Sequence, residues 1–159
     1  VGGGWDGFSV LLLGRGAGGV LNNKNMGAHV VGLDFNRHDR GHLCRAVQEG
    51  IVFSFMYGME IMADTGMPIH TIRAGDANMF MSPIFSQSLA NISAAQIELY
   101  DTDGALGAAR GAGVGAGLYE SLEQAFSTLE KKQIIEPDGT NLNEAYGRWK
   151  NTVEKAIET

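Results

Sequence analysis

The spacing of apolar residues predicts one long helix near the middle of the chain. From residue 40 to residue 64 the apolar positions largely recur in steps of three and four, which places them on one face of a helix. Asp39 has a side chain suited to capping the first turn, and Gly66-Met67-Pro68 ends the helix. Short apolar runs predict strands, the last with alternating burial, at residues 8–13, 29–33, 69–74 and 96–100.

Further helices are predicted in the second half of the chain. Ser82-Pro83 has the chemistry of a helix start. The inner face of that helix would consist of Ile84, Phe85, Ser88 and Leu89. The remaining predicted helices span residues 104–117, which are almost wholly Gly and Ala, 119–132 and 142–157. Strands and helices thus alternate, which predicts a single domain with α/β layering.

Composition narrows the classes of protein that the chain can represent. It has 159 residues, of which 44% are hydrophobic and 19% charged, as in ordinary globular domains. The net charge of −6 argues against nucleic acid and against an anionic membrane surface as partners. No apolar run has the roughly 20 residues that span a bilayer. The single cysteine, Cys44, favours a reducing compartment, so a cytoplasmic location is predicted.

A glycine-rich segment offers one functional hypothesis. Gly14, Gly16 and Gly19 satisfy the dinucleotide-binding spacing after a predicted strand, and Asp34 follows about twenty residues later. Residues 20–28, however, are too short and too rich in Asn and Gly to form the helix that would hold the phosphates. An NAD-type site is therefore kept as an alternative only.

Two other groups of residues were weighed as sites. His38 and His42 lie four residues apart with Cys44 nearby, but no second cluster completes a set of four ligands, so no metal site is predicted. The turn at Gly75, Asp76, Ala77 and Asn78 follows a predicted strand and precedes a helix, an arrangement that lets a nucleotide approach the backbone. The small residues of the Gly/Ala helix after it indicate close packing against a neighbour, room for a ligand near its first turn, or both.

Three sequence blocks resemble the FGGY family of carbohydrate kinases. Gly32-Leu33 with the stretch GHLCRAVQEG at 41–50 is similar to the family's signature helix. IRAGDAN at 72–78 is similar to its adenosine motif, and ALGAA at 105–109 with GVGAG at 113–117 is similar to a further family helix. The blocks occur in the family's order, and their amino-acid sequences most resemble those of the bacterial xylulose kinases within it.

The resemblance implies a fold and a function. The fold would be an α/β ribonuclease H-like, actin-like ATPase lobe, with a mixed sheet flanked by helices. The activity would be ATP- and Mg-dependent phosphorylation of a sugar, most similar to that of D-xylulose kinases. Residues 1–159 would form the C-terminal lobe, in which Gly75, Asp76, Ala77 and Asn78 bind adenosine beside a helix that opens at Asp103. The N-terminal lobe, with the sugar-binding and catalytic groups, would be absent.

Two consequences follow from this interpretation, and one further alternative to it stays open. The isolated chain is expected to be inactive, because phosphoryl transfer needs groups from both lobes held close to their required positions. An isolated lobe exposes its former interface, which favours self-association as a homodimer. A non-catalytic actin-like interaction module is the remaining alternative to a kinase.

Overall fold

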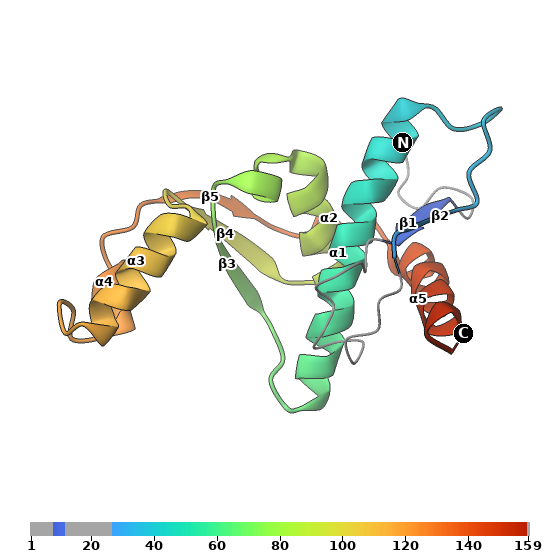
Figure 1. Ribbon diagram of the computed structural model, residues 1–159. Helices are drawn as coiled ribbons and strands as arrows, with labels where there is room; N and C mark the ends of the chain where they lie inside the picture. Colours follow the sequence, from blue (N-terminus) through green and yellow to red (C-terminus); the bar gives the residue numbers. More distant parts are fainter. Residues whose placement is uncertain (1–7, 12–26, 159) are drawn as a thin grey trace.

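The computed structural model describes residues 8–11 and 27–158 (Figure 1). The strands are β1 (Ser9–Leu11), β2 (His29–Val31), β3 (Thr71–Gly75), β4 (Gln96–Tyr100) and β5 (Lys131–Ile135). The helices are α1 (Arg40–Asp64), the 3-10 turn η1 (Asn78–Met81), α2 (Pro83–Ser93), α3 (Gly104–Gly115), α4 (Leu122–Phe126) and α5 (Asn143–Glu158). Within this part of the chain, no helix has the length and apolar character needed to cross a membrane.

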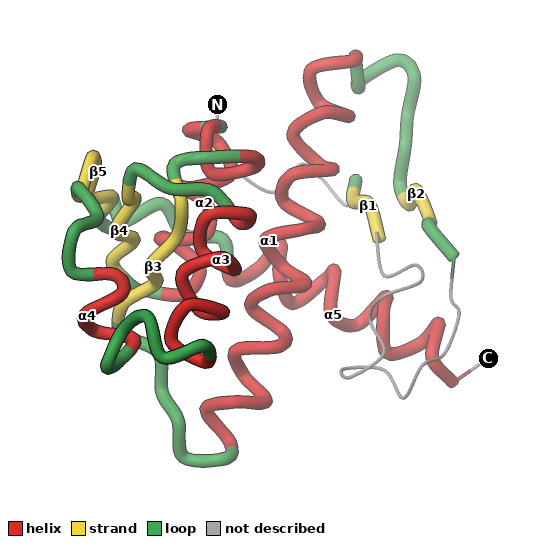
Figure 2. The backbone as a smooth tube through the Cα atoms, turned by 60° about the vertical axis from the view of Figure 1, so that its left-hand side comes forward, coloured by secondary structure: helices red, strands yellow, loops and turns green. Residues whose placement is uncertain are grey.

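The strands form two sheets. β3 and β4 are parallel and β5 joins β4 in antiparallel orientation, which gives a mixed sheet of order β3-β4-β5. β1 and β2 form a separate antiparallel pair on the other side of α1 (Figure 2). The mixed sheet with packed helices agrees with the predicted α/β class. β1 does not extend it, because the carbonyl of Val10 faces Gly50 of α1 and accepts the Trp149 indole N–H of α5 at 3.2 Å.

The long helix α1 has the predicted bounds. Asp39 and His42 form a reciprocal capping box at its first turn, in which the Asp39 carboxylate accepts the backbone N–H of His42 at 3.0 Å. Arg45 and Glu49 lie one turn apart on α1, and Glu49 is buried and bonded to Arg45 at 2.7 Å. Gln48 accepts a hydrogen bond from Ser82 at 2.5 Å, so the Ser82 side chain links α1 to α2 and does not cap α2.

One hydrophobic core joins the main helices to both sheets. Its largest fully buried side chains are those of Trp149, Phe85, Leu11, Ile97, Leu99, Val52 and Val153. Trp149 is fully buried, stacks with Tyr146 and lies 6.0 Å from the Phe53 ring. The amphipathic helix α5 is thus held against α1 by aromatic contacts.

Three local predictions are wrong. Residues 119–132 do not form one helix: α4 covers five residues, and Lys131 already belongs to β5 because that strand pairs with β4. Ile84 is 41% exposed and does not lie on the inner face of α2. β4 shows no alternation, because three successive residues of this central strand are buried. Its middle residue, Glu98, is buried through partners that a single sequence cannot show.

Candidate functional site

The parallel strands β3 and β4 end side by side, and each end turns sharply. Gly75 and Tyr100 are partners in the register. The N–H of Ala77 bonds to the carbonyl of Gly75 at 2.8 Å, and the N–H of Thr102 bonds to that of Tyr100 at the same distance. The carboxyl edge of a parallel pair is where open α/β sheets bind ligands. A Cβ at Gly75 would lie 2.2 Å from the carbonyl oxygen of Thr102, so only glycine allows the two turns to approach so closely.

A cleft of about 620 Å³ opens at this edge of the sheet. Its floor contains Gly75 and Tyr100, one wall is the start of α3, and the facing wall comes from α4 and the segment after it. The members of the facing wall are Glu123, Phe126, Ser127 and Leu129. A second, largely apolar hollow of about 300 Å³ shares Gly75, Asp103 and Gly104 with the cleft. Together the two cavities are large enough for a nucleoside, with the turn after β3 between them.

The α3 wall is a bare stretch of helix. Asp103 caps it by accepting the N–H of Leu106 at 2.8 Å. A Cβ at Gly104, Gly107 or Gly111 would meet no atom within 4 Å. Both interpretations hold, at different residues: close packing is found at Gly113, where a Cβ would lie 2.8 Å from the Tyr119 ring, and open space at the other three. The absent side chains leave open space, and Gly104 and Gly107 line the cleft.

The structure brings together three of the four residues predicted for the adenosine pocket. Gly75 lines both cavities, while Ala77 and Asn78 line the smaller one. Asn78 has a left-handed φ of 53°, which starts the η1 turn. Asp76 instead lines a separate hollow that also involves Gln133 and Ile134 of β5. Phe126 and Ser127 were missed by the sequence analysis, since the pattern there was interpreted as the middle of a longer helix.

An ion-pair cluster adjoins the cleft on the outer face of the sheet. The Glu98 carboxylate contacts the Lys131 ammonium at 2.5 Å, the Tyr100 hydroxyl at 2.7 Å and the Arg73 guanidinium at 3.0 Å. These partners, Lys131 foremost, lower the pKa of Glu98 from 4.5 to about 2. Arg73 and Tyr100 also line the cleft, so Glu98 fixes two of its polar side chains.

The Glu98 cluster predicts a dependence of stability on acid pH. The folded state lowers the pKa of this carboxyl, so its contribution is complete above the ordinary pKa of 4.5 and is lost as pH falls toward about 2. The difference in unfolding free energy between wild type and Glu98→Gln should therefore shrink as pH falls from about 6 to about 3. Urea unfolding followed by circular dichroism would measure it, and a difference that stays constant with pH would contradict the assignment.

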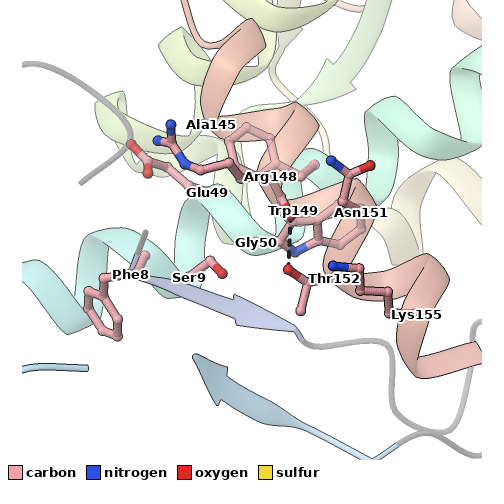
Figure 3. A pocket seen from close by; sticks show the side chains of 12 residues that line it. Phe8, Ser9, Glu49, Gly50, Ala145, Arg148, Trp149, Asn151, Thr152 and Lys155 are labelled. Atoms are coloured by element: carbon pink, nitrogen blue, oxygen red, sulfur yellow. Dashed lines mark hydrogen bonds between the residues drawn. The ribbon is translucent and has the colours of Figure 1, made fainter. Parts of the chain in front are cut away.

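A third cavity, of about 290 Å³, lies between β1, α1 and α5, far along the molecule from the strand ends (Figures 1 and 3). Glu49 and Arg148 point toward one another across it, and the Thr152 hydroxyl donates to the Arg148 carbonyl at 2.9 Å (Figure 3). The cavity contains none of the predicted site residues. The glycines of the dinucleotide fingerprint lie outside the described residues. Asp34 accepts the N–H of Asn36 at 2.9 Å in a local turn.

The two histidines considered as metal ligands have other contacts. The His38 Nδ1 accepts the backbone N–H of Asp34 at 3.0 Å, and its ring stacks on Phe8. The His42 Nδ1 lies 2.7 Å from the Asp39 carboxylate. Among residues 8–11 and 27–158, no group of three His, Cys, Asp or Glu side chains is arranged to hold a metal ion.

Comparison with solved structures identifies the fold. A xylulose kinase from Rhodospirillum rubrum superposes with a TM-score of 0.73 at 21% identity, over 100% of this chain and 33% of that one. A glycerol kinase from Plasmodium falciparum, solved with ADP, gives a TM-score of 0.66 at 23% identity, over 92% of this chain and 30% of that one. The mixed sheet and its helices thus define a lobe of the ribonuclease H-like, actin-like ATPase fold.

Sequence comparison then identifies the family. The model for the C-terminal domain of the FGGY family of carbohydrate kinases matches residues 12–116. An L-xylulose/3-keto-L-gulonate kinase from Escherichia coli is 34% identical over 138 residues, which cover 84% of this chain and 26% of that protein. The chain belongs to the FGGY family of carbohydrate kinases. It spans about a quarter of the length of the curated relative.

Proposed function

We propose that this chain supplies the adenosine-binding lobe of an enzyme that transfers the γ-phosphoryl group of ATP to a sugar, and that the sugar is D-xylulose. The observation that carries the proposal is the cleft at the ends of β3 and β4, formed by the same turn that resembles the family's adenosine motif. Membership of the FGGY family supports the reaction class. The ADP named for the glycerol kinase supports the nucleotide.

The base would occupy the slot between the bare start of α3 and the Phe126 ring. Gly104 and Gly107 leave the backbone of one wall exposed, which suits the flat face of a purine, and Phe126 offers an apolar surface opposite. Asn78 provides an amide in the adjoining hollow for the base or the ribose. Asp103 caps α3, and the part of the chain that the structure describes contains no group of three His, Cys, Asp or Glu side chains arranged to hold a metal ion.

The slot is tested by adding a methyl group to one wall. Gly107→Ala places a Cβ in the open space of the cleft and should weaken binding of Mg-ATP at least tenfold, measured by calorimetric titration of the chain. The same change should leave the fold intact, because alanine is more stable than glycine in a helix interior by about 0.5–1 kcal/mol. Gly111→Ala is the matched control, since its Cβ also meets nothing within 4 Å and it does not line the cleft.

Four outcomes would contradict parts of this proposal. Equal ATP affinity in wild type and Gly107→Ala would remove the base from this slot. Binding of NADH without binding of ATP would favour the dinucleotide alternative built on Gly14, Gly16, Gly19 and Asp34. Phosphorylation of D-xylulose by the 159-residue chain alone would overturn the proposal that catalysis requires a second lobe. A preference for glycerol when the chain is joined to an N-terminal lobe would replace the sugar.

A further inference from the structure

The α3–α4 hairpin has little packing of its own. Gly113 is the only buried residue of α3 and Ala125 the only one of α4. The hairpin projects from the end of the sheet, away from α1 and α5 (Figure 1). A helix of five residues is unstable without tertiary contacts. Leu122 is 61% exposed, so the apolar contacts of α4 come from the buried Ala125 and the half-buried Phe126. Polar contacts to α3 add to these few apolar ones in holding α4.

Arg110 supplies those contacts. From the middle of α3 its Nη1 donates to the carbonyl of Ala125, in the last turn of α4, and to the hydroxyl of Thr128 at 3.0 Å. A guanidinium with two acceptors fixes a direction as well as a distance. Its Nε is buried and has no hydrogen-bond partner in the described part of the chain. An unsatisfied buried donor costs free energy, so stability alone does not account for Arg110.

The two residues bonded to Arg110 lie on either side of two residues of the cleft wall. Ala125 and Thr128 flank Phe126 and Ser127, which face α3 across the cleft. Arg110 thus links the middle of α3 to the residues on both sides of Phe126 and Ser127. We propose that Arg110 is a positioning residue for the nucleotide, which acts by holding the α4 wall at the width of a purine. This inference rests on the proposed function.

The test is Arg110→Met, which keeps an unbranched side chain and removes the guanidinium. We expect Mg-ATP to bind the chain at least tenfold more weakly, and backbone amides of residues 122–129 to exchange hydrogen faster, with no change in α1 or α5. Arg110→Lys, which retains one donor, should restore part of the affinity. Arg148→Met is the matched control, since Arg148 pairs with Glu144 within the surface of α5, away from the cleft.

Each result separates this inference from the function on which it rests. Unchanged exchange at residues 122–129 in Arg110→Met would overturn the role of Arg110, whether or not ATP binds. Faster exchange with unchanged ATP affinity would also overturn it, because a loose wall would then not matter to the nucleotide. A wild-type chain that binds no ATP, with faster exchange in the variant, would refute the proposed function and with it the nucleotide role of Arg110.

Discussion

Replacing Gly75 by alanine is expected to destabilise the chain by about 3 kcal/mol and to abolish nucleotide binding. The new Cβ would lie 2.2 Å from the carbonyl oxygen of Thr102 and 3.0 Å from its carbon, and both atoms belong to backbone. Neither side can yield easily, because the carbonyl of Tyr100 accepts the N–H groups of both Asp76 and Thr102 at 2.8 Å. Relief of the clash must shift the start of α3, which is a wall of the cleft.

Gly58→Ala is the control for this experiment. Gly58 lies inside α1, and a Cβ there would meet nothing within 4 Å, so the change should stabilise the helix by about 0.5–1 kcal/mol. Urea unfolding followed by circular dichroism would compare the two variants, and calorimetry would measure ATP binding. If Gly75→Ala unfolds within about 0.5 kcal/mol of wild type, the close approach of the two turns is not the reason for this glycine.

The second large effect is expected at Trp149. Its side chain is fully buried and packs against Tyr146 and Phe53. Its indole N–H donates to the Val10 carbonyl at 3.2 Å. Trp149→Ala should lower the unfolding free energy by about 3–5 kcal/mol, a large fraction of what a domain of this size has. The loss should detach β1 first, because its free edge is held by the indole and by contact with α1.

Two further variants give this prediction its controls. Trp149→Phe keeps a buried ring but removes the donor to Val10, so it should cost less than alanine and still loosen β1. Phe35→Ala removes a ring that is 88% exposed and should change stability by no more than about 0.5 kcal/mol. Circular dichroism during urea unfolding would rank the three, and a ranking that places Trp149→Ala near Phe35→Ala would contradict the core assignment.

The elements that the sequence predicted well are those whose signals are local. α1 begins after Asp39 and ends before Gly66, because a capping box and a turn lie next to the residues they affect. β5 was missed because its signal is not local: Lys131 lies against Glu98, 33 residues earlier, and pairing with β4 outweighs the helical pattern of the preceding segment. The burial of Glu98 has the same origin.

In the candidate site, too, the features with a local signal were predicted and those that depend on distant contacts were not. The turn at Gly75 was predicted because a strand that ends in glycine before a helix start can be seen in one short window. Its reason was only half anticipated, since the close approach that requires glycine is to Thr102 of the chain itself. The Phe126 wall could not be predicted, because α4 depends on tertiary contacts such as the one between Arg110 and Ala125, 15 residues apart.

The lysines of β5 also bear on how the protein behaves in concentrated solution. β5 is one of the two outer strands of the described three-stranded sheet, and an outer strand offers unpaired backbone groups to other molecules. Lys131 and Lys132 stand on it, each held in a salt bridge, with Glu98 and with Asp101. A second chain that aligned along this edge would have to bury these ammonium groups. Lys131 and Lys132 therefore disfavour aggregation by addition of a strand along β5.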